Sequence, residues 1–200
     1  MQNIHPIFDH ILDRDHKENF LKQRSLVIWM VGLSGSGKSA IAHALEESLQ
    51  KAGHLTQILD GDNLRTGINN NLGFTEKERL ENIRRSAEVS KLFMNCGVIT
   101  ICSFISPTEQ VRAVAKTIIG EDGFYEVYIN CPLEVCEKRD VKGLYKKARS
   151  GSIKNFTGIN APFQPPVNPF LELCTDMDDV ETCKNKLLDA ILPLIKIGNR

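Results

Sequence analysis

GLSGSGKS, residues 32–39, directly follows SLVIWMV, residues 25–31, and these two stretches decide the fold. The apolar, β-branched run predicts a buried strand. The glycines predict a turn whose backbone N–H groups converge on phosphate oxygens, and a helix that begins in the turn adds partial positive charge. Lys38 is placed to bridge the β- and γ-phosphates of a nucleotide, and Ser39 to ligate Mg²⁺. The pattern therefore predicts a phosphate-binding loop between a strand and a helix.

Predicted strands and helices alternate along the rest of the chain. Short apolar runs predict further strands at residues 54–60, 97–104, 124–130 and 171–174. Helical spacing predicts helices from the loop to about residue 52 and at residues 75–95, 107–119 and 180–195. This order predicts an α/β fold, a three-layer sandwich of the P-loop kinase type, with a central parallel sheet of about five strands and helices on both faces. Ligands then bind beyond the carboxyl ends of the strands.

Length and composition limit the function classes. The 200 residues predict an N-terminal arm over residues 1–24, with a weak helical pattern from Ile7 to Leu21, and a single domain over residues 25–200. Lys+Arg 25 and Asp+Glu 25 give a net charge of zero, which argues against binding to nucleic acid or to an anionic membrane. The six cysteines form no Cys-x-x-Cys pair and are predicted to be reduced core thiols of a cytoplasmic protein.

A basic segment covers residues 133–159, where seven basic residues accompany three acidic ones. It predicts a mobile basic lid, and a lid favours a small-molecule kinase, because phosphoryl transfer needs the exclusion of water and the stabilisation of negative charge. A GTPase is disfavoured. The one Asn-Lys pair, at residues 185–186, is followed by two leucines and lacks the aspartate of a guanine-binding Asn-Lys-x-Asp motif.

Polar residues that could bind a second substrate follow the second predicted strand. Asp60 and Asp62 lie at its carboxyl end, where either carboxylate could hold a Mg²⁺ water or accept a proton from an acceptor hydroxyl. Arg79 and Asn82 lie three residues apart on one face of the predicted 75–95 helix, a spacing that suits the binding of an anion. The two groups predict an acceptor site beside the phosphate-binding loop.

Several longer motifs resemble the adenylyl-sulfate kinase family. They are DGDNLRTGINNNLGF at 60–74, RLENIRR at 79–85, SFISP at 103–107, CPLEVCEKRD at 131–140, KGLYKKAR at 142–149 and FTGI at 156–159. The resemblance covers roughly residues 14–192 in consistent order. It implies Mg²⁺-dependent transfer of the ATP γ-phosphate to the 3′-hydroxyl of adenosine 5′-phosphosulfate, which gives ADP and 3′-phosphoadenosine 5′-phosphosulfate in sulfate assimilation.

The resemblance also assigns roles to residues at matching motif positions. It implies that Asp62 acts at the 3′-hydroxyl as a base or metal anchor, and that Phe74 and Phe156 sandwich the acceptor adenine. The implied acceptor set is Asp62, Asn63, Arg65, Phe74, Arg79, Asn82, Ile105, Ser106, Lys142 and Phe156. The predicted ATP set is Gly32, Leu33, Ser34, Gly35, Ser36, Gly37, Lys38, Ser39 and Cys174. The predicted catalytic residues are Lys38, Asp62 and Ser106, and Mg²⁺ is assigned to Ser39 with Asp62 as a second candidate.

The serine that matches Ser106 is often designated a phosphoserine intermediate in the family. We predict direct in-line transfer instead, because direct transfer needs only positioning and electrostatics. A serine nucleophile needs an activating group, and the sequence places no clear one near Ser106.

The chain departs from the family pattern after the FTGI motif. Where the family commonly reads Asp-x-Pro-Tyr-Glu-x-Pro, this chain has Asn160, Phe163 and Gln164, and Phe170 replaces a common glutamate. These changes predict altered lid closure or altered contacts with the donor nucleotide.

Two other functions stay open at this point. One is a small-molecule P-loop kinase with a different acceptor, such as a nucleoside or sugar-acid kinase, and the other is a nucleotide-binding regulatory paralogue. The resemblance is also compatible with a homodimer and with a functional link to an ATP sulfurylase.

Overall fold

The helices and strands of the protein follow from a computed structural model that describes residues 3–7 and 10–198. In chain order they are α1 (Arg14–Leu21), β1 (Val27–Val31), α2 (Lys38–Lys51), β2 (Thr56–Asp60), α3 (Gly61–Thr66), α4 (Glu76–Asn95), β3 (Ile99–Phe104), α5 (Glu109–Ile119), the 3-10 turn η2 (Glu121–Gly123), β4 (Phe124–Asn130), α6 (Leu133–Arg139), α7 (Leu144–Arg149), β5 (Leu171–Cys174) and α8 (Val180–Ile195). The predicted strands and core helices are present. One difference is α3, which replaces a predicted turn because the Asp60 carboxylate accepts a hydrogen bond from Asp62 N and caps a helix there.

The five strands form one parallel sheet in the order β2-β3-β1-β4-β5, which confirms the predicted fold class. β1 lies at the centre, between β3 and β4. The carboxyl ends of parallel strands share one edge, so the loop after Val31, the Asp60 end of β2 and the residues after Phe104 come together there. This edge is where the predicted site residues must meet.

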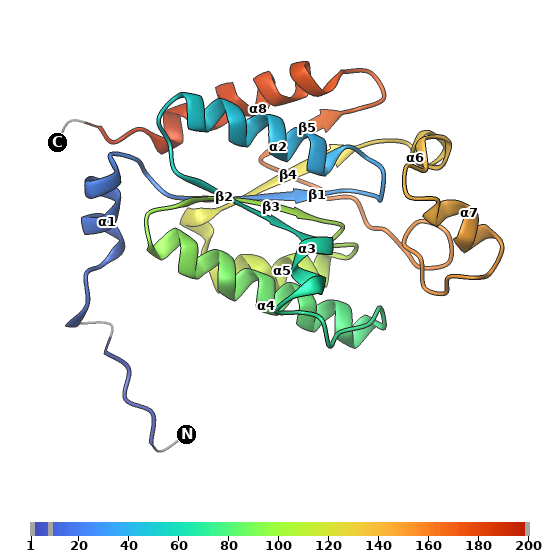
Figure 1. Ribbon diagram of the computed structural model, residues 1–200, viewed down its shortest axis with the longest axis horizontal. Helices are drawn as coiled ribbons and strands as arrows, with labels where there is room; N and C mark the ends of the chain where they lie inside the picture. The colour runs from blue at the N-terminus through green and yellow to red at the C-terminus, as the bar shows by residue number, and fades with distance from the viewer. Residues whose placement is uncertain (1–2, 8–9, 199–200) are drawn as a thin grey trace.

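Helices cover both faces of the sheet, α2 and α8 on one side and α4 and α5 on the other (Figure 1). The side chains of β1 alternate between these layers: Ile28 and Met30 join the α2/α8 core, and Trp29 joins the α4/α5 core. All five residues of β1 are buried, as expected for the central strand of a parallel sheet. Among the residues that the structure describes, every helix is too short or too polar to cross a membrane.

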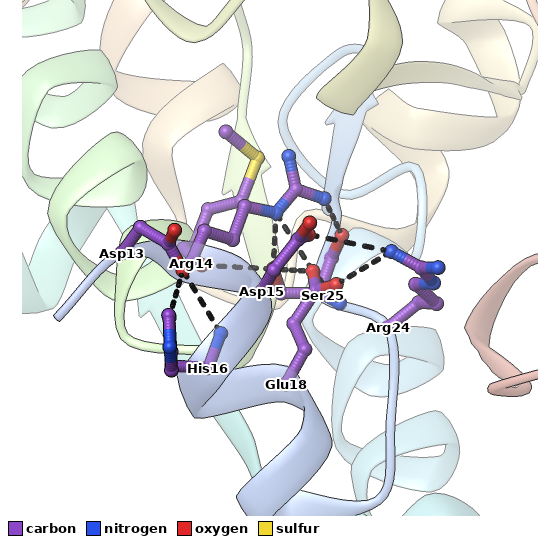
Figure 2. Close-up of polar contacts among 8 residues, drawn as sticks. Asp13, Arg14, Asp15, His16, Glu18, Arg24 and Ser25 are labelled. Atoms are coloured by element: carbon purple, nitrogen blue, oxygen red, sulfur yellow. Dashed lines mark hydrogen bonds and ion pairs between the residues drawn. The ribbon is translucent and has the colours of Figure 1, made fainter.

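A buried carboxylate connects α1 to the start of the sheet (Figure 2). Glu18 is 1% exposed and accepts hydrogen bonds from Ser25 N at 2.8 Å, Ser25 Oγ at 2.6 Å, Arg14 Nε at 2.7 Å and Arg24 Nη1 at 3.1 Å. Burial alone would raise the pKa of Glu18, but the bonds from Ser25 and Arg14 outweigh it and hold the pKa below its ordinary value. The ionised carboxylate thereby connects α1 to the residue from which the chain enters β1.

The helix of the N-terminal arm is shorter than the pattern from Ile7 to Leu21 predicts, since within the described residues it spans Arg14–Leu21. α1 begins at Arg14, because the Asp13 side chain accepts a hydrogen bond from His16 N and caps the helix. Residues 1–2 and 8–9 of the predicted arm lie outside the described residues.

The predicted lid, residues 133–159, contains α6 and α7 and packs on the phosphate-binding loop. Leu33 of the loop shares a small apolar cluster with Cys136, Tyr145 and Phe156 of the lid. Tyr145 also donates a hydrogen bond from its hydroxyl to Ser34 O at 2.8 Å. These contacts place the basic segment directly over the phosphate-binding loop.

The residues that depart from the family pattern make contacts within this chain. Asn160 Oδ1 accepts from Phe156 N, and Gln164 Oε1 accepts from Glu109 N at 3.0 Å, at the start of α5. Phe163 stacks on Tyr128 with ring centroids 6.2 Å apart. The loop after the lid is therefore connected both to the lid and to α5.

Candidate active site

A cavity of about 380 Å³ lies at the carboxyl edge of the sheet. Its wall combines the phosphate-binding loop, helix α3 after β2, the start of α4, the end of β3 and the lid. The predicted site residues that line it are Ser34, Gly35, Gly37, Lys38, Ser39, Asp62, Arg65, Phe74, Arg79, Asn82, Ile105, Ser106 and Lys142. Segments that lie far apart in the sequence thus form one pocket.

The geometry of the phosphate-binding loop requires its glycines. Gly37 has a φ of 101°, a left-handed conformation that residues with a Cβ rarely adopt. A Cβ on Gly32 would lie 2.5 Å from Ile129 O of the neighbouring strand. The sequence therefore turns sharply from β1 into α2, whose N-terminal backbone N–H groups are free to bind an anion at this position.

The side chain of Lys38, the first residue of α2, folds back onto the phosphate-binding loop. It is 8% exposed, and its Nζ donates to Gly32 O at 2.9 Å and to Leu33 O at 2.7 Å. Burial removes water from the ammonium, and this loss of solvation lowers the pKa of Lys38 to about 8. A phosphate at the loop would restore favourable electrostatics to this buried cation.

Three side-chain oxygens meet beside Lys38, one each from α2, β2 and β3. Ser39 Oγ donates to Asp60 Oδ2 at 2.8 Å and lies 3.2 Å from Ser103 Oγ. Mg²⁺ prefers oxygen ligands and usually keeps several waters, with one or two carboxylates and substrate phosphates completing its shell. The hydroxyl of Ser39 and the carboxylate of Asp60 fit that donor set, because they hydrogen-bond to each other. Asp62, the second residue that the sequence proposes for Mg²⁺, hydrogen-bonds to Lys142 instead.

Two arginines lie close to an aromatic ring in another part of the cavity wall. The guanidinium carbons of Arg65 and Arg79 lie 4.3 Å and 5.7 Å from the centroid of Phe74, whose side chain is 58% exposed. Arg65 Nη1 donates to Leu72 O and Gly73 O, which holds the turn that carries the ring. Burial lowers the pKa of both arginines, yet both stay cations at neutral pH.

Arg79 connects the acceptor wall to the lid. It donates to Phe74 O at 3.0 Å, to Thr157 Oγ1 at 3.0 Å and to Asn155 O. The buried Asn82 follows one helical turn later and accepts from Asn69 Nδ2 at 3.1 Å. Arg79 and Asn82 both line the cavity, which confirms the prediction from their spacing that they lie on one face of α4.

Ser106 lies beyond β3 in an unusual backbone conformation. Its φ is 42°, and it is 2% exposed. Its Oγ accepts a hydrogen bond from Trp29 Nε1 at 3.0 Å, and its carbonyl accepts from Arg112 Nη1 at 3.2 Å. Within the described residues, no carboxylate or imidazole hydrogen-bonds to this hydroxyl.

Six predicted site residues, all within the described part of the chain, do not line the cavity. They are Gly32, Leu33, Ser36, Asn63, Phe156 and Cys174. Phe156 packs edge-on against Tyr145, with ring centroids 4.9 Å apart, so it does not form the expected sandwich with Phe74. Asn63 is an exposed residue of α3. Cys174 ends β5, and the contact with the loop comes from the next residue, where Thr175 Oγ1 donates to Ser36 O at 2.8 Å.

Sequence reasoning missed several contacts at this site, three of which involve Ser103, Tyr145 and Trp29. Ser103 lies beside Ser39, Tyr145 connects the lid to the loop, and Trp29 bonds to Ser106. Ser103 could have been found, because it lies near the end of a predicted strand at the ligand-binding edge. The contacts of Tyr145 and Trp29 join elements 111 and 77 residues apart and leave no local pattern.

Comparisons with known proteins agree on one family. The family model described as "Adenylylsulphate kinase" matches residues 24–174. An adenylyl-sulfate kinase of Bacteroides fragilis is 60% identical over 193 residues, with 96% of each chain covered. One of Bacteroides thetaiotaomicron is 59% identical over 194 residues, with 97% of this chain and 96% of the relative covered. A solved structure of the Mycobacterium tuberculosis APS kinase in complex with AMPPNP and APS has a TM-score of 0.81 at 43% identity, and the match covers 84% of this chain and 98% of that one.

Proposed function

Because the chain belongs to the adenylylsulphate kinase family, we propose that its cavity transfers the γ-phosphate of ATP to the 3′-hydroxyl of adenosine 5′-phosphosulfate. The products are ADP and 3′-phosphoadenosine 5′-phosphosulfate, an activated form of sulfate made in sulfate assimilation. One observation carries this proposal beyond kinases in general. Beside the phosphate-binding loop, the cavity wall holds the exposed ring of Phe74 with Arg65 and Arg79 next to it, which offers a ring and positive charge to an acceptor that has both an adenine and an anionic tail.

The donor side is formed by the phosphate-binding loop. Lys38 contacts the β- and γ-phosphates, and the N-terminus of α2 supplies backbone N–H groups. We assign Mg²⁺ to Ser39 and Asp60, where it would neutralise charge on the phosphates. The lid, including Tyr145, packs on the phosphate-binding loop and helps to exclude water from the transferred phosphoryl group.

The acceptor side orients the sulfonucleotide against the donor. The exposed ring of Phe74 stacks on the adenine, while Arg79 and Asn82 bind the phosphosulfate. Phe156 stabilises the lid by packing on Tyr145. The selectivity for an adenine-bearing acceptor thus rests on Phe74.

Asp62 accepts the proton of the 3′-hydroxyl as the hydroxyl attacks the γ-phosphate. Its carboxylate faces Lys142 of the lid, and this hydrogen bond raises the pKa of Lys142, so the lysine stays charged. Transfer is direct. The Ser106 hydroxyl is buried and accepts the indole N–H of Trp29, an arrangement that does not activate a nucleophile.

The two alternative functions fit the site less well. A sugar acid offers no ring to stack on Phe74, and a regulatory paralogue would be expected to have lost Lys38 or Asp62, both of which line the cavity. The homodimer, the link to an ATP sulfurylase and the cytoplasmic location stay predictions.

A coupled ADP-release assay on the purified full chain tests the proposed function. The acceptors are adenosine 5′-phosphosulfate, adenosine 5′-monophosphate, a nucleoside and a sugar acid, each with ATP and Mg²⁺. We expect rapid ADP release with adenosine 5′-phosphosulfate alone, and its loss in Lys38→Ala. Faster release with the nucleoside or the sugar acid, or release that does not depend on an acceptor, would contradict the proposal.

A further inference from the structure

The indole of Trp29 has one polar atom in an apolar environment. Trp29 is fully buried in the α4/α5 core, and its ring lies 4.8 Å from the ring of Phe104 and 5.8 Å from that of Phe124, centroid to centroid. A buried indole N–H needs a hydrogen-bond partner, because an unsatisfied donor is costly in such surroundings. The partner is Ser106 Oγ, 77 residues further along the chain.

The direction of this hydrogen bond is fixed by chemistry. An indole nitrogen can only donate, so Ser106 Oγ must accept. The hydroxyl then keeps a single hydrogen of its own to donate. Ser106 lines the cavity between the end of β3 and Pro107, and within the described residues Trp29 is the one hydrogen-bond partner of its Oγ. The remaining hydrogen can therefore be donated to a molecule in the cavity.

The backbone of Ser106 is held in place from the other side. Arg112, which is 6% exposed, donates from Nη1 to Ser106 O at 3.2 Å and to Gln164 O at 2.7 Å, and its Nε lies 3.1 Å from Glu126 Oε1. Ser106 has a φ of 42°, and a residue with a Cβ keeps such a conformation only when its surroundings enforce it. Strained positions of this kind concentrate at functional sites.

We infer that Trp29 is a positioning residue for the acceptor: its indole N–H orients the Ser106 hydroxyl so that the hydroxyl hydrogen is donated to the sulfonucleotide. This inference rests on the proposed function. Strand β1 then positions both substrates, since Val31 leads into the phosphate-binding loop and Trp29, two residues earlier, acts on the acceptor through Ser106.

Steady-state kinetics of three variants and one control test the inference. Trp29→Phe removes the indole N–H, Ser106→Ala removes the hydroxyl, and the double variant removes both. Each single change should raise KM for adenosine 5′-phosphosulfate by about three- to tenfold, with KM for ATP unchanged, because each weakens or removes the hydrogen bond from the Ser106 hydroxyl to the acceptor. The double variant should be no worse than Ser106→Ala alone.

Phe124→Leu is the matched control for lost packing. It trims the same aromatic cluster beside Trp29 and leaves the bond to Ser106 intact. We expect Phe124→Leu to lower the melting temperature without raising KM for the acceptor. Equal KM effects of Phe124→Leu and Trp29→Phe, or additive effects of Trp29→Phe and Ser106→Ala, would overturn the inference.

A second measurement needs no change to Trp29, and it applies even where Trp29→Phe fails to fold. The chain has one tryptophan, so a ¹⁵N-labelled sample gives one indole N–H cross-peak in the NMR spectrum. This peak should shift in Ser106→Ala and when adenosine 5′-phosphosulfate is added to the wild type. A peak that stays in place in both experiments would overturn the inference, whereas a wild type that turns over no sulfonucleotide would contradict the proposed function itself.

Discussion

Lys142 Nζ lies 2.5 Å from Asp62 Oδ2, so an ion pair joins the lid to the acceptor wall across 80 residues of sequence. The side chains are 60% and 70% exposed, and a pair this accessible contributes little to stability. The ion pair does place the Lys142 ammonium beside the Asp62 carboxylate, which we propose accepts the proton of the acceptor hydroxyl. The contact therefore couples the position of the lid to the reacting atoms.

Replacing Lys142 should affect catalysis far more than folding. We expect Lys142→Ala to lower kcat by about 10²-fold, as for other lost cations at a developing charge, and to change the free energy of unfolding by less than about 1 kcal/mol. Lys147→Ala is the control, since Lys147 is an exposed lysine of α7 outside the cavity wall. Steady-state kinetics and urea unfolding check both quantities, and equal kinetic effects of the two variants would contradict the assignment.

Removing the Arg79 side chain should weaken acceptor binding selectively. A hydrogen bond to a charged group contributes about 1.5–3 kcal/mol, so Arg79→Ala should weaken binding of adenosine 5′-phosphosulfate by about 10- to 150-fold. ATP affinity should stay nearly unchanged, because Arg79 lies on α4 and its hydrogen bonds go to Phe74, Asn155 and Thr157 and not to the phosphate-binding loop. Calorimetric titration with each nucleotide measures both affinities. Arg84→Ala, on the same helix but paired with Glu81, should behave as wild type. Equal losses for both nucleotides would show that Arg79 has a structural role only.

Glu18 should make the fold sensitive to acid. Its pKa in the folded protein lies below the ordinary value of 4.5, so its contribution to stability is fully present above the unfolded pKa and is lost as the pH falls through the folded pKa. Glu18→Gln should lower the free energy of unfolding by about 3 kcal/mol at neutral pH, because Arg14 and Arg24 lose their buried partner.

The difference between wild type and Glu18→Gln should shrink as the pH falls from about 7 to about 3, which urea unfolding at several pH values can follow. Glu47→Gln is the control, since Glu47 is 56% exposed on α2. A difference that is independent of pH would mean that the size of the Glu18 side chain matters and its charge does not.

The ranking of two further variants separates direct transfer from a phosphoserine route. Asp62→Asn should slow the reaction by about 10²–10⁴-fold, as expected for a lost general base, whereas Ser106→Ala should slow it at most about tenfold. A rapid quench with γ-labelled ATP provides the second readout. The phosphoserine route requires the reverse ranking and recovery of label on Ser106.

The elements that were predicted correctly are those with strong local patterns. β4, β5 and α8 have the predicted bounds, and the helix predicted at residues 75–95 is present as α4, which Thr75 caps together with Glu78. The start of β2 was predicted two residues too early. There the Gln23 side chain bonds to both N and O of Leu55, a contact between segments 32 residues apart that no local pattern shows. β3 also begins later than predicted, because Gly97 has a positive φ in the turn after α4.

The site shows the same division between local and distant contacts. The phosphate-binding loop, Asp62 and Arg79 have motifs that lie at a strand end or on one helical face, and the structure brings them to one cavity. The burial of Phe156 depends on how the lid packs around Tyr145, and an aromatic residue in a motif looks the same whether it faces a ligand or a core. The bond between Trp29 and Ser106 is likewise a product of the folded sheet.

Phosphorus NMR of the wild-type reaction tests the central claim most directly. The full chain is mixed with ATP, Mg²⁺ and adenosine 5′-phosphosulfate, and the phosphorus resonances are followed over time. We predict a new phosphomonoester resonance from the 3′-oxygen of the sulfonucleotide, with its phosphosulfate intact, in step with the conversion of ATP to ADP. Loss of the γ-phosphate to inorganic phosphate while the sulfonucleotide stays unchanged would contradict the account.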